Sequence, residues 1–225
     1  MNTIDTLMKR KHVRRYKDKN ISNETVNHLL QKSWKATSSK NNFMAYKIHV
    51  LDHTKEFEKQ LVWYKCVSKQ IASETEAAEK GEIEKPQGKP NQYYNHIKEN
   101  SHLLIFTSRV CEPNDFMKEA IKDGHIAHEL YPEYVDDIID NTAVEVGMFT
   151  SHLTLFCMEE NIDVSYTACF PRQVKKWFNL PFIKQRPILL MSLGYGEEYR
   201  NDVLKKKGQL KKDYKPSKDT IISWE

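Results

Sequence analysis

The pattern of apolar and polar positions predicts a first amphipathic helix over residues 21–36. Its apolar residues recur with the 3.6-residue period of a helix: Val26, Leu29, Leu30 and Trp34. Ser22 stands where a serine caps a helix N-terminus, and Glu24 lies in the first turn, where a carboxylate favours the helix dipole. We therefore expect a helix that buries one stripe and then leads into the Ser- and Asn-rich turn over residues 36–42.

Other stretches of the chain have the same helical period. Residues 54–78 predict a helix whose apolar face holds Phe57, Leu61 and Tyr64. Residues 113–130 favour a further helix, and residues 132–161 contain the longest one. The long helix should bury one face, formed by Ala143, Val146, Phe149, Leu153 and Phe156. A short helix is predicted over residues 174–181, where Asn-Leu-Pro ends it.

Short β-prone runs lie between the predicted helices. Residues 46–51 alternate between polar and apolar, whereas 103–107 form a continuous apolar run of the length of a buried central strand. Further strands are expected at 164–166, 188–193 and 220–224. Glycines and prolines among charges predict an exposed excursion or lid over residues 79–100. Helices that alternate with few strands predict one α+β domain of three layers over residues 1–225.

Composition excludes several classes of function. The chain has 225 residues and a formal net charge of +4, a mild excess compared with the dense basic patch of a nucleic-acid-binding domain. It has 7 glycines and no G-x-G-x-x-G sequence, which argues against a dinucleotide-binding loop. No run approaches the roughly 20 apolar residues of a membrane span, and the N-terminus has no apolar signal segment. We expect neither a nucleic-acid nor a membrane partner.

The cysteines and histidines suggest no metal site. The 4 cysteines are scattered and form no C-x-x-C pair, so we interpret them as reduced thiols in a cytoplasmic protein. His125 and His128 lie three residues apart, but no third ligand is marked. Ser151 and His152 are neighbours that point to different sides of a helix, so they form no nucleophile and base pair.

Two segments near the N-terminus carry the chemistry of a phosphorylated, hydroxylated ligand. Residues 10–16 place arginines, a lysine and a histidine close together, and guanidinium groups hold a phosphate dianion well. Residues 37–42 supply the hydroxyl and amide groups that suit an alcohol chain. Near the C-terminus, residues 215–219 add further cations. Each segment alone is also typical of an ordinary basic arm, turn or tail.

The order and spacing of these segments resemble the nitroreductase family of FMN-dependent oxidoreductases. In that family an Arg-x-Ser-x-Arg/Lys signature precedes an amphipathic helix, a Pro-Ser-x-x-Asn turn and a first strand. A late strand then runs into Gly-Tyr and a basic tail, here Gly194-Tyr195 and the residues after it. The resemblance covers nearly the whole chain. It implies a mixed sheet flanked by helices, in an intertwined homodimer with the long helix from about Thr142 at the interface. The C-terminal strand would extend the partner's sheet.

The resemblance also implies cofactor contacts. Arg10 would bind the FMN phosphate, Lys11 and His12 would shape the same loop, and Arg14 would lie near N1 and O2 of the flavin ring. In the second subunit, Ser38, Ser39 and Asn41 would bond the ribityl and pyrimidine oxygens. Ala168 or Cys169 would offer a backbone N–H to flavin N5, and Lys215 would add a phosphate contact. The chain departs from the family at His12, Thr37 and Cys169, where serine, proline and a glycine-containing segment are usual.

The function implied by this resemblance is hydride transfer from NAD(P)H through FMN to a small oxidised acceptor, such as a nitroaromatic or a quinone, in a ping-pong cycle. No catalytic side chain beyond the flavin is marked. One alternative is a flavin-dependent enzyme of the same fold with a specialised reaction, namely dehalogenation or consumption of the flavin itself. Others are a flavin-binding protein without turnover and a basic nucleic-acid-binding domain.

Overall fold

A four-stranded sheet forms the middle of the fold. The structure is a computed structural model, and it describes residues 10–39, 44–66, 96–109, 115–124, 135–168, 180–206 and 208. The strands of the sheet stand in the order β2 (Tyr46–Leu51), β3 (His102–Ser108), β5 (Pro187–Gly194) and β4 (Asp163–Thr167). All four agree with runs that the sequence predicts. The buried apolar run becomes β3, one of the two central strands.

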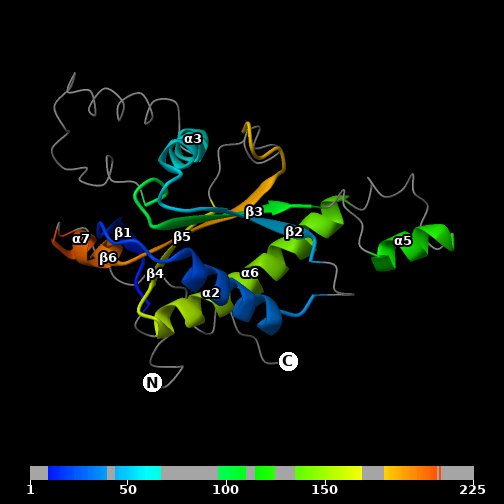
Figure 1. Cartoon of the computed structure of the whole chain (residues 1–225), viewed down its shortest axis with the longest axis horizontal. Helices are drawn as coiled ribbons and strands as arrows, with labels where there is room; N and C mark the ends of the chain where they lie inside the picture. The colour runs from blue at the N-terminus through cyan, green and yellow to red at the C-terminus, as the bar shows by residue number, and fades with distance from the viewer. Residues whose placement is uncertain are drawn as a thin grey trace.

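Helices cover both faces of this sheet, which confirms the three-layer α+β fold (Figure 1). On one face lie α2 (Asn23–Ala36) and α6 (Val135–Glu159), and on the other lies α3 (Glu56–Cys66). Alternate residues of β3 supply the two cores. Leu104 and Phe106 pack with α2 and α6, whereas Leu103 and Ile105 pack with α3. Because both faces are covered, every residue of β3 is buried. Helix α5 (Asp115–Lys122) lies within the helical segment predicted over residues 113–130, whereas most of the helix predicted over residues 174–181 lies outside the described residues.

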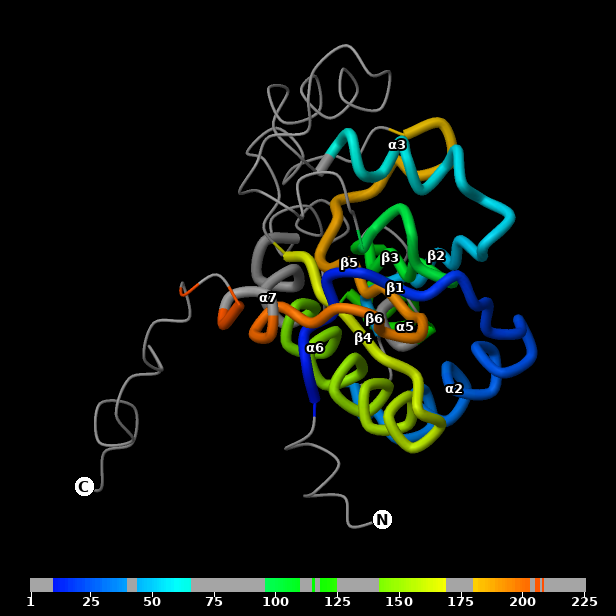
Figure 2. The backbone as a smooth tube through the Cα atoms, turned by 90° about the vertical axis from the view of Figure 1, so that its left-hand side faces the viewer, coloured from blue at the N-terminus to red at the C-terminus, as the bar shows by residue number. Residues whose placement is uncertain are grey.

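A second, two-stranded sheet lies at one end of the molecule. It pairs β1 (Val13–Tyr16) with β6 (Gly196–Tyr199), and α7 (Arg200–Lys206) follows β6 directly. Figures 1 and 2 show these three elements together beside β4. The sequence pattern did not predict them, because four-residue strands rich in charged side chains have too little periodicity. This small sheet joins the cationic N-terminal segment to residues almost two hundred positions later.

Every described strand pair is antiparallel. The mixed sheet expected from the resemblance needs a parallel pair, and such a pair would involve residues outside the described ones. Residues 174–179 and 220–224 both lie outside them. Strand exchange therefore stays a prediction.

Helix α2 has the expected start but a different buried stripe. The side chain of Ser22 accepts a hydrogen bond from the Thr25 backbone N–H at 3.1 Å and caps the helix as predicted. Trp34, however, is 56% exposed, so its assignment to the buried stripe was wrong. Ser33 is buried instead, because its hydroxyl donates to the Leu29 carbonyl at 2.8 Å and so needs no solvent. The exposed Trp34 leaves an apolar surface on this helix.

Two other predicted faces need correction. In α3, Phe57 is 70% exposed, and the buried positions are Lys59, Val62 and Trp63. The helix is rotated from the expected face because the Lys59 ammonium donates to two backbone carbonyls in the interior. In α6 the expected face is buried at Val146, Phe149 and Leu153, but Ala143, more than two turns into the helix, is exposed.

The predicted excursion over residues 79–100 is also too long. Its described part begins at His96, and there Ile97 and Asn100 are both buried. Asn100 donates to the carbonyls of His96 and Ile97 and to the Ser192 hydroxyl of β5. These bonds hold residues 96–100 against the sheet, so this part of the segment belongs to the body of the fold.

Candidate functional site

The small sheet brings a further cation, Arg200, from a distant part of the sequence to the N-terminal cluster. Val13 pairs with Tyr199, and the Arg200 backbone N–H donates to the His12 carbonyl at 2.8 Å. Arg200 therefore begins α7 beside the segment that contains Arg10 and Arg14. Its charge is close enough to lower the pKa values of both His12 and Arg14.

In the part of the chain that the structure describes, the guanidinium groups of this cluster have no carboxylate partners. Within the described residues, no ion pair involves Arg10, Arg14 or Arg200. Arg10 lies over the Tyr166 ring, with its guanidinium carbon 4.8 Å from the ring centre. Partial burial and then the neighbouring Arg200 lower the pKa of Arg14. An anionic ligand binds well to positive charges that are partly desolvated and have no acidic partner.

Two histidines stand within this cationic surrounding. The His12 ring lies edge-on to His96, with 5.9 Å between their centres. Nε2 of His12 is 3.2 Å from the Ser165 hydroxyl, and Nε2 of His96 is 2.8 Å from the Thr167 hydroxyl. Burial, followed by the charges of Arg14, Arg10 and Arg200, lowers the pKa of His12 to about 4. Burial lowers the pKa of His96 to about 3, with smaller contributions from His12 and Arg14. Both rings are neutral at pH 7.

Lys11 faces away from this cluster. Its ammonium pairs with Asp202 of α7 at 3.3 Å and lies 4.9 Å from the centre of the Tyr199 ring. Both partners of the ion pair are more than half exposed, so the pair contributes little to stability. Lys11 thus contacts α7 from just before β1, and it lies beside the site without facing it.

The polar turn after α2 is built around Ser39 and Thr37. The Ser39 hydroxyl donates to a Glu145 carboxylate oxygen of α6 at 2.6 Å and accepts from the Met44 backbone N–H. Thr37 caps the end of α2: its hydroxyl donates to the Ser33 carbonyl, so at 3.0 Å it accepts from Nδ1 of His152. Thr37, which stands where the family usually has proline, thus forms a hydrogen bond that links α2 to α6. Ser38 is exposed.

The cationic cluster and the polar turn lie at opposite ends of α2 (Figure 1). The 14 residues of this helix span roughly 21 Å. Within one chain the structure brings together Arg10, His12 and Arg14, but it leaves Ser38 and Ser39 apart from them. Ala168 directly follows Thr167, so it lies at the end of β4 that contacts His96. Asn41, Cys169 and Lys215 lie outside the described residues.

A sequence comparison decides which family this arrangement represents. The sequence model of the nitroreductase family matches residues 7–195. The chain belongs to the nitroreductase family. The match extends from just before the cationic cluster to the Gly194-Tyr195 pair after β5. Among curated proteins, a search found no match to this nitroreductase-family chain.

Solved structures share the same fold at low sequence identity. A protein assigned as an NAD(P)H:FMN oxidoreductase from Staphylococcus epidermidis has a TM-score of 0.62 and 12% identity, covering 99% of this chain and 95% of its own. One assigned as a nitroreductase and solved in complex with FMN, from Exiguobacterium sibiricum, has a TM-score of 0.59 and 15% identity over 100% and 98%. A nitroreductase family protein from Streptococcus pneumoniae also has a TM-score of 0.59 and 15% identity, over 100% of both chains. At these identities the likeness shows the fold.

The donors of the cluster fit the phosphate of FMN, the cofactor implied by the family. A phosphate monoester carries nearly two negative charges and is held best by guanidinium donors. Arg10 and Arg200 flank His12 in a region where the described residues offer no competing carboxylate partner. The turn at Ser38 and Ser39 offers hydroxyl groups and the Glu145 carboxylate, which suit an alcohol chain.

Sequence reasoning missed Arg200, His96 and the hydroxyls of Ser165 and Thr167. Arg200 carried no signal of its own, because only the pairing of β1 with β6 brings it to His12. His96 lay inside the supposed excursion. Alternation along β4 would place Ser165 on the polar face with Asp163 and Thr167, so its full burial could not be inferred from the pattern.

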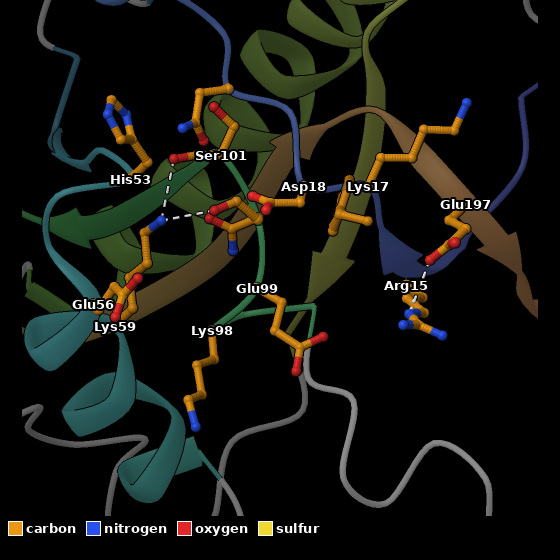
Figure 3. A pocket seen from close by; sticks show the side chains of 13 residues that line it. Arg15, Lys17, Asp18, His53, Glu56, Lys59, Lys98, Glu99, Ser101 and Glu197 are labelled. Carbon is orange, nitrogen blue, oxygen red and sulfur yellow. Dashed lines mark hydrogen bonds and ion pairs between the residues drawn. The ribbon is translucent and has the colours of Figure 1, made fainter.

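A separate cavity of about 610 Å³ lies between β1 and α3. Figure 3 shows Lys59 inside it, near Ser101 and His53, with the ion pair of Arg15 and Glu197 on the other side. The Lys59 ammonium donates to the carbonyls of Asn100 and Ser101 at 2.8 and 3.1 Å. Burial lowers its pKa to about 8, opposed by the charges of Asp52 and Glu56. Lys59 thereby fixes the segment that carries His96.

The described residues contain no group of three or more metal-binding side chains. None of the described helices is long and apolar enough to cross a membrane.

Proposed function

We propose that this chain is an FMN-dependent oxidoreductase. It takes hydride from NAD(P)H and passes it to a small oxidised acceptor, such as a nitroaromatic or a quinone, in a ping-pong cycle. Membership of the nitroreductase family supports the FMN chemistry, and the structural neighbour named as an NAD(P)H:FMN oxidoreductase supports the donor. The observation that carries the proposal is the cluster of guanidinium groups around His12, which form no ion pair with any residue that the structure describes.

The residues of the cluster divide the work of binding. Arg10 and Arg200 would hold the phosphate of bound FMN, and Arg14 would stabilise negative charge on the flavin ring. Bound FMN supplies the hydride chemistry at N5, and the protein supplies position and charge. A fixed cation beside N1 favours the form that carries negative charge there, so Arg14 raises the flavin's reduction potential. Partial burial of Arg14 strengthens this effect, because its charge is poorly screened by water.

The two halves of the proposed site belong to two copies of the chain. The cluster and the Ser38–Ser39 turn lie at opposite ends of α2, so one flavin does not contact both within one chain. In a homodimer, one flavin can contact both segments if the turn of one subunit faces the cluster of the other. The surface next to the turn has the apolar side chains of a dimer interface: Trp34 is 56% exposed, and Val144 and Met148 are 64% and 40% exposed on one side of α6.

The proposal is tested by the absorption spectrum of the purified chain, followed by titration with FMN and riboflavin. We expect a yellow protein, or one that binds added FMN more tightly than riboflavin, because only FMN carries the phosphate. Under anaerobic conditions NADH or NADPH should then bleach the bound flavin, and quinone should restore its colour. Riboflavin binding as tight as FMN binding would contradict the phosphate assignment. Tight FMN binding without reduction by either nucleotide would indicate a flavin-binding protein without turnover.

A further inference from the structure

The hydrogen bonds of His12 fix which of its ring nitrogens carries the proton. Ser165 is fully buried and has one hydroxyl proton, which it donates to the Val13 carbonyl at 3.2 Å. The same oxygen lies 3.2 Å from Nε2 of His12, so it accepts a hydrogen bond there. A neutral His12 is therefore protonated on Nε2 and has a bare lone pair on Nδ1. In this state Nδ1 can accept a hydrogen bond but cannot donate one to a phosphate.

His96 lies beside the His12 ring and is held by the same strand. Nε2 of His96 is bonded to the Thr167 hydroxyl at 2.8 Å, and its ring meets His12 edge-on. Ser165 and Thr167 both belong to β4, so one strand orients both rings. The side of His12 opposite to Nε2 makes no hydrogen bond within the described part of the chain. The His12 ring is therefore oriented through Nε2, and its Nδ1 remains able to bond to a ligand.

The groups around His12 are mostly cationic. Its own segment contributes Arg10 and Arg14, and α7 contributes Arg200. The turn before β3 contributes the neutral His96, and β4 contributes Tyr166 beneath Arg10.

The nearby acids have partners of their own. Asp163 of β4 accepts from the Gly196 backbone N–H at 2.9 Å and from the Tyr199 hydroxyl at 3.2 Å. Asp202 of α7 pairs with Lys11. The field at His12 therefore opposes a proton as long as no anion is present, in agreement with its lowered pKa of about 4.

We propose that His12 takes up a proton from water on Nδ1 when a phosphate dianion enters the cluster, and so becomes a further cationic donor to that phosphate. This inference rests on the proposed FMN function. A dianion among the three arginines offsets most of their positive charge and places a negative charge beside His12, which favours the imidazolium. The new N–H bond supplies the donor that neutral His12 lacks, while Nε2 keeps its bond to Ser165. Phosphate binding and proton uptake are thereby coupled.

Calorimetry of FMN binding to the full chain tests this coupling. Titrations between pH 5 and pH 8, in buffers of different ionisation enthalpy, measure the protons taken up per FMN. The phosphate of FMN has a pKa near 6 and so takes up protons itself. The proton uptake of the wild type is therefore compared with that of His12→Gln, which keeps a neutral amide donor toward Ser165 but does not titrate. His96→Gln is the matched control, because it replaces the neighbouring histidine in the same cluster.

The wild type should take up more protons than His12→Gln, and its FMN affinity should fall more steeply as pH rises, by up to about tenfold per pH unit for each additional proton. His96→Gln should retain the additional proton uptake, and riboflavin binding should cause none in any variant.

Equal proton uptake by the wild type and His12→Gln would overturn the inference while leaving the proposed function intact. Absence of FMN binding to the wild type at every pH would instead overturn the proposed function. If His12→Gln does not fold, a histidine NMR titration of the wild type with inorganic phosphate decides, since unchanged titration of His12 would also overturn the inference.

Discussion

Gly194 is the position where a single added methyl group should disturb both the fold and the site. It ends β5, and a Cβ built there would lie 2.5 Å from Cδ1 of Tyr16 and 3.0 Å from Cε1. Tyr16 is 5% exposed, and its hydroxyl donates to the Ser192 carbonyl at 3.0 Å. In Gly194→Ala the Tyr16 ring must therefore move, although it is packed on all sides.

The cost follows from these contacts. Overpacking a well-filled core costs about 1–3 kcal/mol. Loss of the bond between Tyr16 and Ser192 adds about 1 kcal/mol, because a buried hydroxyl and carbonyl are left without partners. We expect Gly194→Ala to lower the free energy of unfolding by about 2–4 kcal/mol and the melting temperature by roughly 5–15 °C. Since Tyr16 shares β1 with Arg14, the variant should also retain FMN less well.

Urea unfolding, followed by circular dichroism, measures this cost. Gly147→Ala is the matched control, because Gly147 lies inside α6 and a Cβ there meets nothing within 4 Å. That variant should gain about 0.5–1 kcal/mol, since alanine favours a helix. A Gly194→Ala chain as stable as the wild type, or one no less stable than Gly147→Ala, would refute the reasoning from the Tyr16 contact.

The remaining predictions concern the site, acid stability and assembly. Arg14→Ala should lower the flavin reduction potential and the rate of reduction more than it weakens FMN binding, whereas Arg10→Ala should chiefly weaken FMN retention; equal effects of both variants on both quantities would remove this division of labour. His102 is fully buried between Ser101 and Asn23, and burial, reinforced by Lys59, lowers its pKa from 6.5 to about 4. The unfolded chain therefore binds more protons between these values, so the stability of the folded chain should fall as pH drops from about 6.5 to about 4, and His102→Gln should flatten this dependence in urea unfolding series. Truncation before Thr220 should weaken dimerisation and FMN binding together, as measured by sedimentation and FMN titration of the intact and truncated chains; unchanged binding by a truncated monomer would count against strand exchange.

Periodicity predicted the elements that pack against the sheet. The stripe of α2, the alternation of β2 and the apolar run of β3 each predicted an element that the structure contains. Burial agrees with the prediction throughout β3, whereas Trp34 of α2 and Val50 of β2 are 56% and 43% exposed. The errors arise where a polar group is satisfied inside the protein. Lys59 is buried because two carbonyls accept from its ammonium, and Ser33 is buried because its hydroxyl bonds within its own helix.

The candidate site was only partly visible in the sequence for a different reason. Arg10, His12 and Arg14 are neighbours along the chain, so their grouping is local. Arg200 and His96 reach them through the pairing of β1 with β6 and through the turn before β3. Such long-range contacts depend on topology, and short charged strands leave no periodic signal from which to infer it. The resemblance to a family supplied the ligand class, and the structure supplied these additional residues.

The most direct test of a flavin site shared between two copies is a mixed dimer. One parent carries Arg10→Ala, which disables the cationic cluster. The other carries Ser38→Tyr, a bulky change at an exposed position that should block the turn without harming its own chain. In the purified mixed dimer, one site contains both defects and the other contains neither. We expect each parental homodimer to bind FMN poorly and the mixed dimer to regain one tight site per dimer. A mixed dimer that binds FMN no better than its parents would contradict the shared site.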